Sequence, residues 1–290
     1  SMKRAASSPV ITVHYGTVYM PSTMKGIGAF APEDVPLKCN KRVEFPPTFT
    51  KVPSISALLS ATSDLTLLKY WQQKMIRNLG TAGFRRWMTE RAGSGTKFHS
   101  EVERIVSGLH SGTLNETDEA ILNTVAKNVR PYLQSILPIL RSFEFAESPE
   151  LITEQAVQHP RLCYQGRFDA ILPLRAGPVL VDWKTSSSSS SISSSMNSPS
   201  FSADSLYSYP LQMAAYVGAV NASSSYAALP QITRSFVVLA NENGKEGRIV
   251  EIEGEELEKH WSLWFERLRD FWRKVSDLQA KGETVLDLRI

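Results

Sequence analysis

The chain has 290 residues, of which 42% are hydrophobic, and its formal net charge is +3. This length suits one large domain or a domain with an arm, and the hydrophobic fraction is sufficient for a sizeable core. No window approaches the roughly 18 uninterrupted apolar residues of a transmembrane helix, so we expect no membrane association. The two cysteines, Cys39 and Cys163, lie far apart and provide neither a disulfide framework nor metal-ligand spacing, which favours a reducing compartment.

Positive charge is concentrated in residues 38–97, which carry eleven Lys and Arg against Glu44, Asp64 and Glu90. A basic segment of this kind favours a partner that carries phosphate groups. A solvated basic surface would give the same composition. Charge alone therefore leaves both interpretations open.

The first half of the chain is expected to contain an arm followed by helices. Residues 1–50 are rich in proline and predict an irregular arm, and residues 51–290 predict a single domain. Apolar residues recur at helical spacing in the first part of that domain, residues 51–145, and Gly80 is a natural stop. Three helices are expected there, over residues 52–80, 95–109 and 117–142.

The apolar period changes to that of strands after residue 150. Strands are expected over residues 151–158, 163–172, 178–186, 234–241 and 247–253. Helices are expected over residues 205–221 and 255–281, and the serine-rich run 185–200 is expected to be a flexible loop. This order predicts an α/β (α+β) domain in which helices flank a central mixed β-sheet, with the sheet core over residues 150–255.

The strand expected over 178–186 carries charged residues that are costly to bury without partners. Residues two apart on a strand share a face, so Asp182 and Lys184 point the same way. Asp169 on the preceding strand can reach the same face. Two converging carboxylates suit a hard cation such as Mg²⁺ or Mn²⁺, and the lysine supplies a positive charge for a phosphate oxygen or an attacking water. A solvated hairpin is the alternative for these residues alone.

Several motifs taken together resemble one nuclease family. The stretch GRFDAIL…VLVDWKTS resembles the core of the PD-(D/E)xK nuclease superfamily, in its RecB-like branch, with Phe168 in place of the proline. The upstream GTKFH, which contains His99, resembles a metal-ligand motif of that branch. LQMAAY, with Gln212 and Tyr216, resembles its Q-x-x-x-Y motif, and VPSISALLS resembles its early serine motif. The order of the motifs also agrees.

The resemblance implies a ligand set and a cofactor. His99, Asp169 and Asp182 would hold Mg²⁺, helped by the carbonyl of Trp183, and Mn²⁺ would substitute. Asp169, Asp182 and Lys184 would be the catalytic residues. An iron–sulfur cluster, which some relatives hold with four cysteines, is excluded because the chain has two.

Residues outside the hairpin are expected to contact DNA. Under the same resemblance Gln212 contacts the site or the DNA backbone, and Tyr216 packs beside it. The candidate phosphate contacts in the basic segment are Arg85, Arg86 and Lys97. Trp71 and Trp87 could stack on bases, but packing in a core is favoured for both.

The resemblance implies a metal-dependent exonuclease that acts on single-stranded DNA ends. Within the branch, the chain most resembles the exonucleases that maintain mitochondrial DNA, which implies a mitochondrial location. We expect a monomer. One alternative is a catalytically silent nucleic-acid-binding module with the same fold, and the intact set of His99, Asp169, Asp182 and Lys184 argues against it. A hydrolase of small phosphates is a second alternative, but such a substrate needs no extended basic segment.

Overall fold

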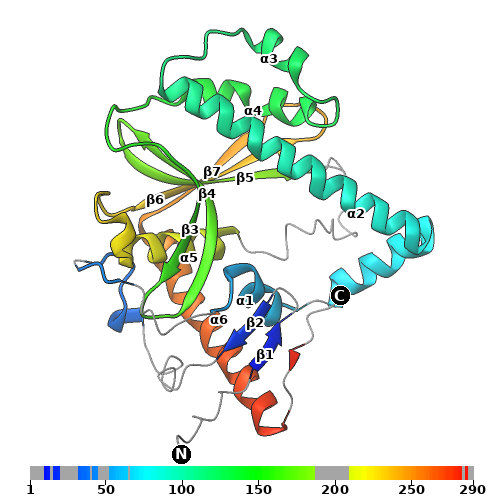
Figure 1. Cartoon of the computed structure of the whole chain (residues 1–290), viewed down its shortest axis with the longest axis vertical. Helices are drawn as coiled ribbons and strands as arrows, with labels where there is room; N and C mark the ends of the chain where they lie inside the picture. The colour runs from blue at the N-terminus through cyan, green and yellow to red at the C-terminus, as the bar shows by residue number, and fades with distance from the viewer. Residues whose placement is uncertain are drawn as a thin grey trace, which may run out of the picture.

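A computed structural model of the chain has a central sheet with helices on both faces (Figure 1). The structure describes residues 10–13, 16–19, 32–39, 41–44, 52–64, 66–186, 209–282 and 285–286. A loop was expected over the serine-rich run 185–200, and most of that run lies outside the described residues, which end at Ser186 and begin again at Tyr209. Within the described part of the chain, no helix has both the length and the apolar composition that a membrane span requires.

The sheet is mixed, as the sequence predicts. Its five strands in the described residues follow the order β3-β4-β5-β6-β7. Neighbouring strands are antiparallel except for β5 and β6, which are parallel. The strands are β3 (Ile152–His159), β4 (Tyr164–Leu174), β5 (Gly177–Ser186), β6 (Arg234–Asn241) and β7 (Arg248–Glu253). These bounds agree closely with the expected ranges, because short alternating or continuous apolar runs bounded by turn residues mark these segments as strands.

The helices are α1 (Ile55–Thr62), α2 (Thr66–His110), α3 (Asp118–Thr124), α4 (Arg130–Ser142), α5 (Tyr209–Ala222) and α6 (Gly254–Ala280). Short elements are β1 (Val10–Val13), β2 (Gly16–Tyr19), β8 (Val285–Leu286), and the 3-10 helices η3 (Pro32–Asp34) and η6 (Ser224–Tyr226). The segment expected to be irregular thus contains two strands, β1 and β2, which pair with each other, and β1 also pairs with β8.

Two apolar cores lie on opposite faces of the sheet. One contains residues of α1, α5 and α6, and the other contains residues of α4 and the last part of α2. Strand β5 divides its side chains between them, since Leu180 belongs to the first core and Val181 and Trp183 belong to the second. The alternation of a strand therefore places Asp182 and Lys184 on the α5 side of the sheet.

Two of the expected helices are each broken into two. The range 117–142 forms α3 and α4, because Thr117 caps one helix by accepting a hydrogen bond from the Ala120 amide (3.2 Å) and a proline opens the other. The range 52–80 is interrupted after α1, which Ser54 caps. The helix expected over 95–109 begins much earlier, because Gly93 and Gly95 stay helical and the break occurs at Gly80 instead.

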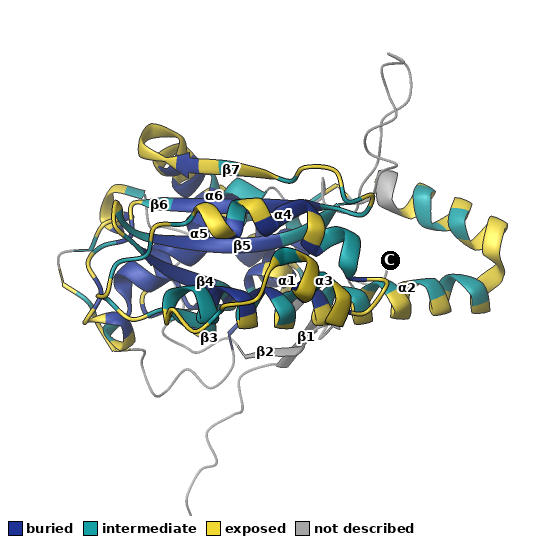
Figure 2. Cartoon of the chain, turned by 90° about the horizontal axis from the view of Figure 1, so that it is seen from above, coloured by how far each residue is buried: buried dark blue, intermediate teal, exposed yellow. Residues whose placement is uncertain are grey.

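The first part of helix α2, residues 66–97, forms a helical arm that stands away from the sheet (Figures 1 and 2). Gly80 has a φ of 70° and a ψ of 163°, which are not helical, so the chain changes direction there. Among the described side chains of residues 66–97, none is buried, whereas Phe98 is fully buried in the second core. The arm is therefore held at its C-terminal end, next to His99.

Candidate active site

The site lies where β4 separates from β5. The two strands pair from Leu174↔Gly177 up to Ala170↔Val181, and Asp169 is the next residue of β4. One oxygen of its carboxylate, Oδ2, accepts a hydrogen bond of 2.7 Å from the backbone N–H of Trp183. The end of the pairing thus opens space between the strands, and a carboxylate occupies it.

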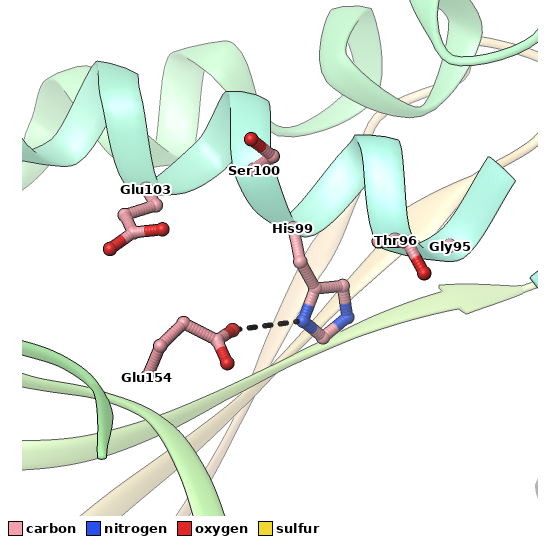
Figure 3. Close-up of a pocket in the computed structure, with 6 residues that line it drawn as sticks. All are labelled: Gly95, Thr96, His99, Ser100, Glu103 and Glu154. Carbon is pink, nitrogen blue, oxygen red and sulfur yellow. Dashed lines mark ion pairs between the residues drawn. The ribbon is translucent and has the colours of Figure 1, made fainter. Parts of the chain in front are cut away.

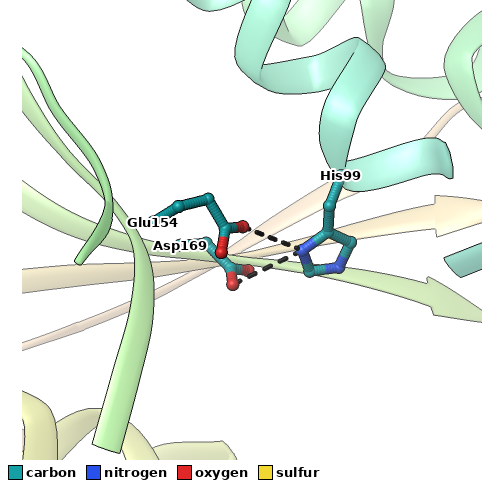
Figure 4. Close-up of side chains that lie close together, drawn as sticks. All are labelled: His99, Glu154 and Asp169. Carbon is teal, nitrogen blue, oxygen red and sulfur yellow. Dashed lines mark ion pairs between the residues drawn. The ribbon is translucent and has the colours of Figure 1, made fainter. Parts of the chain in front are cut away.

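His99 reaches this space from α2. Its Nδ1 lies 3.4 Å from Asp169 Oδ1 and 3.8 Å from Glu154 Oε1 (Figure 4). Burial lowers the pKa of His99, but the hydrogen bond and negative charge of Asp169 outweigh burial, so the pKa is raised above its ordinary value. The buried neighbour Phe98 anchors this turn of the helix and so fixes the direction of the imidazole.

The three residues His99, Glu154 and Asp169 can hold a metal ion. Each offers a ligand atom, and these atoms lie within 4.8 Å of one another. Two carboxylates and one imidazole form a donor set that suits a divalent cation, with oxygen ligands favouring Mg²⁺ or Mn²⁺. A cavity of about 360 Å³ opens beside His99 and Glu154, with Thr96 and Glu103 among its lining residues (Figure 3). His99 and Glu154 therefore face a space that solvent or a ligand can enter.

Asp182 and Lys184 form a close ion pair next to this group. Lys184 Nζ lies 2.6 Å from Asp182 Oδ2, and the Asp182 side chain is 4% exposed. Burial raises the pKa of Asp182 to about 6, although the charge of Lys184 opposes the shift. Burial would lower the pKa of Lys184, but the carboxylates of Asp182 and Asp169 outweigh it and raise that pKa. The lysine is thus a charged donor in a poorly solvated position.

The residues predicted for the hairpin are brought together, in an arrangement that differs in detail. His99 and Asp169 share the three-residue group with Glu154, whereas Asp182 is paired with Lys184. Trp183 is fixed to the site through its N–H, because that group donates to Asp169. Glu103, one helical turn after His99, accepts a hydrogen bond from Thr153 Oγ1 (2.6 Å).

Glu154 was not among the predicted site residues. It lies opposite Asp169 in the β3–β4 register, between the pairs Thr153↔Ala170 and Gln155↔Phe168. Its φ of 49° is in the left-handed region, which an ordinary residue adopts at a cost of about 1 kcal/mol. The β3–β4 register would have identified Glu154 as the partner of Asp169, but the sequence did not predict the turn between β3 and β4 that sets this register.

Gln212 and Tyr216 lie on the α5 side of the site. Gln212 Nε2 donates to Tyr216 OH (3.3 Å). A Cβ atom at Gly166 would lie 2.5 Å from Tyr216 Cε1 and 2.9 Å from Ile55 Cδ1. The absence of a side chain at Gly166 thus makes room for these two side chains.

The predicted DNA contacts in the basic segment lie on the arm. Arg85, Arg86 and Lys97 are exposed, and Lys97 is two residues before His99. Trp71, Phe84 and Trp87 form a ring cluster with centroid distances of 5.7–6.2 Å, and each is only half-buried. The expectation that Trp71 and Trp87 pack in a core is wrong, because the arm is too far from the sheet to share its interior (Figure 2).

Known proteins are similar to this chain. The chain is 29% identical over 226 residues to mitochondrial genome maintenance exonuclease 1 of Homo sapiens, an overlap of 77% of this chain and 59% of that protein. Identity to the protein of the same name is 28% in Mus musculus and 26% in Xenopus tropicalis, with 79% and 86% of this chain covered. The chain spans 59–65% of the length of these curated relatives.

A family comparison covers most of the chain and all of the site. The model of the PD-(D/E)XK nuclease superfamily matches residues 75–284. That range contains His99, the β4–β5 hairpin with Asp169, Asp182 and Lys184, and the whole of α5. With the mixed sheet and the grouped carboxylates, this match shows that the chain belongs to the PD-(D/E)XK nuclease superfamily.

Proposed function

We propose that this chain is a metal-dependent exonuclease that hydrolyses phosphodiester bonds at the ends of single-stranded DNA. The observation that carries the proposal is the group of His99, Glu154 and Asp169 next to the Asp182–Lys184 pair. A cation site and a neighbouring fixed ammonium group are what hydrolysis of a phosphodiester requires. We assign the activity to a single domain over residues 51–290, which an N-terminal segment of residues 1–50 precedes.

The cofactor we propose is Mg²⁺, with Mn²⁺ as a substitute. His99 and Asp169 would hold it, together with Asp182 and the carbonyl of Trp183, and Glu154 adds a third carboxylate at the same place. When bound, the cation supplies a Lewis acid for the scissile phosphate and lowers the pKa of an attacking water. The hydrogen bond from Trp183 N–H keeps one Asp169 oxygen fixed, so the other is directed toward His99.

Lys184 would position the attacking water and balance the charge that develops on the phosphate. Its ammonium group is held by Asp182 at 2.6 Å, and the raised pKa keeps it protonated at neutral pH. A charged donor in a poorly solvated position stabilises developing negative charge better than one in bulk water. Asp182 thus has a second task, which is to orient the lysine.

The helical arm of α2, residues 66–97, supports single-stranded DNA as the substrate. Basic residues there include Arg85, Arg86 and Arg91, and the Arg91 guanidinium lies 5.0 Å from the centre of the Trp87 ring. Single strands bind to surfaces that combine positive charge for the phosphates with aromatic rings for the unstacked bases. The half-buried rings of Trp71 and Trp87 offer such faces, whereas a duplex keeps its bases stacked inside.

A role in mitochondrial DNA maintenance is supported by the names of the relatives in three vertebrates. We also propose that the chain acts as a monomer, which light scattering of the purified protein measures directly. The rival function is a DNA-binding module without activity. The complete set of ligand and lysine side chains favours the enzyme, since a silent module needs none of them to persist.

The deciding experiment uses end-labelled single-stranded and duplex DNA with Mg²⁺, Mn²⁺ or EDTA. We expect shortening of the single strand with either cation, little cleavage of blunt duplex and none in EDTA. Lys184→Ala should be inactive on every substrate, which excludes a contaminating nuclease. Binding of DNA by the intact chain without any cleavage would identify the silent module, and equal cleavage of duplex and single strand would contradict the proposed substrate.

A further inference from the structure

A second cavity lies along β4 from the metal-ligand group. Its volume is about 330 Å³, and Ser54, Ser56, Gln165, Arg167 and Tyr216 are among its lining residues. Tyr216 connects the cavity to the active site, because its hydroxyl lies near enough to Asp182, Lys184 and Asp169 for their charges to act on it. The cavity is thus next to the reacting centre and is separate from the space beside Glu103.

Arg167 brings a positive charge to this cavity. It is two residues before Asp169 on β4, a separation of roughly 7 Å along the strand. Its Nε donates to Glu154 Oε2 at 2.8 Å, which fixes the plane of the guanidinium. The Nη groups carry the remaining N–H donors, and a fixed guanidinium edge matches the geometry of a phosphate. The side chain is 63% exposed and therefore accessible to a ligand.

Two hydroxyl groups face the same space from the start of α1. Ser54 Oγ accepts a hydrogen bond from the Ala57 amide at 3.1 Å, which locks its rotamer. Ser56 Oγ lies 3.1 Å from Ser54 Oγ. The segment that precedes α1 is held to β4, since Gln165 donates a hydrogen bond from its backbone N to Pro53 O (3.0 Å) and another from its side chain to Val52 O (2.9 Å). The serines and Arg167 are therefore parts of one rigid wall.

The floor of the cavity is closely packed around Gly166. Gly166 leaves no room for a side chain, because Tyr216 and Ile55 fill the space in which its Cβ would lie. Donors on the wall and a ring at the floor suit a phosphate group joined to a sugar. They do not suit a second cation, since Arg167 would repel it.

We propose that Arg167, Ser54 and Ser56 form a second phosphate-binding subsite, which holds the DNA phosphate adjacent to the one being cleaved. The inference rests on the proposed function, since it assigns a place to the substrate of that site. A phosphate held one step along β4 fixes the register of the strand, so the scissile bond stops at the metal-ligand group. The ion pair with Glu154 couples this register to the ligands of the cation.

The test is binding of a fluorescent oligothymidylate, measured by anisotropy over a salt series in a Lys184→Ala background that cannot degrade it. Arg167→Ala should weaken binding about tenfold and reduce the slope of log K against log salt by about 0.7, the value for one single-strand phosphate. Ser56→Ala should weaken binding without altering the salt slope, because a hydroxyl carries no charge. Arg175→Ala is the matched control, since Arg175 is 73% exposed at the far end of the same hairpin.

A second arm of the experiment locates the phosphate. Oligonucleotides with one neutral methylphosphonate linkage, moved along the strand, should bind the intact subsite less well at one position. Arg167→Ala should be indifferent to that position. Equal effects of the linkage in both proteins would overturn the subsite. If Arg167→Ala lowers the affinity for Mn²⁺ as much as the affinity for DNA, the subsite is also overturned, because Arg167 would then act only through Glu154.

Failure of the proposed function is recognised separately. Cleavage of unmodified strands is measured with the chain that retains Lys184. If that chain does not cleave with Mg²⁺ or Mn²⁺ while Arg167 still couples to one linkage, the exonuclease is excluded and the phosphate subsite stands.

Discussion

The carboxylate of Asp169 is shared between a strand and a helix. Its Oδ2 accepts a hydrogen bond from Trp183 N–H at 2.7 Å, and its Oδ1 lies 3.4 Å from His99 Nδ1. One oxygen is thus oriented by β5, and the other faces the imidazole that α2 supplies. Asp169 is the residue whose loss should separate binding of the metal from the chemistry of Lys184.

Asp169→Asn should lower the affinity for Mn²⁺ by about tenfold or more, because a neutral amide is a poorer ligand and its single oxygen cannot both accept the hydrogen bond from Trp183 N–H and face the cation. Lys184→Ala should abolish cleavage and leave Mn²⁺ affinity nearly unchanged. Calorimetric titration of both variants is the measurement, and Asp118→Asn, an exposed aspartate that pairs with Arg141, is the control. Equal loss of metal affinity in both variants would contradict the separate roles.

His99→Ala should remove nearly all activity with little effect on folding. The side chain is 29% exposed and makes no contribution to the buried cores, so the melting temperature should change by less than about 3 °C. The neighbouring Phe98→Ala is the contrasting variant, because Phe98 is fully buried and its truncation should cost about 3–5 kcal/mol. A large fall in melting temperature for His99→Ala, with activity retained in the folded fraction, would make it a structural residue.

Arg85 and Arg86 on the arm should contribute to DNA affinity through charge. The double substitution to alanine should lower the salt slope of single-strand binding by up to about 1.4, which corresponds to two phosphates. Trp87→Ala should weaken binding without changing that slope, since stacking releases no counterions. Anisotropy in the inactive background measures both. Binding unchanged in both proteins would remove the arm from the DNA interface.

Gly166→Ala should destabilise the chain by about 1–3 kcal/mol, because the new methyl group would overlap Tyr216 and Ile55. Displacing Tyr216 should also reduce activity beyond the loss of folded protein. Gly93→Ala is the control, because Gly93 lies inside α2 with open space around its Cβ position, and alanine should stabilise the helix there by about 0.5–1 kcal/mol. Denaturant unfolding gives both values, and a Gly166→Ala protein as stable as the original would contradict the packing.

His159 should make the fold sensitive to acid. Burial lowers the pKa of His159 to about 3, and its Nδ1 accepts hydrogen bonds from the Arg161 and Leu162 amides (3.2 and 3.1 Å). The unfolded chain binds a proton near pH 6.5 that the folded chain does not bind. This contribution to stability is therefore complete above pH 6.5 and is lost between pH 6.5 and 3, at about 1.4 kcal/mol per pH unit.

His159→Asn keeps an acceptor near the position of Nδ1 and removes the titrating group. The variant should be less stable at pH 7, and its unfolding free energy should fall less steeply between pH 6.5 and 5. The quantity to compare is the difference between the two proteins at each pH, because other groups titrate equally in both. A difference that stays constant over this range would show that His159 is not responsible.

The sequence determined much of the sheet and the chemistry of its hairpin. The five strands of the sheet follow from short apolar runs bounded by turn residues, and the pair Asp182 and Lys184 shares a face because the strand period is fixed. It did not determine where helices break, as 117–142 and 95–109 demonstrate. Breaks depend on competition between caps, prolines and packing, and glycines such as Gly93 are tolerated within a long helix.

Tertiary structure alone decided which side chains meet. Glu154 joins His99 and Asp169 because of the β3–β4 register and a left-handed backbone at one residue, and neither is encoded in a short stretch of sequence. Arg167, Ser54 and Ser56 surround one cavity because α1 lies against β4, more than a hundred positions later in the chain. The kinds of donor are local properties of the sequence, whereas the distances between them depend on how the strands separate and how distant segments pack.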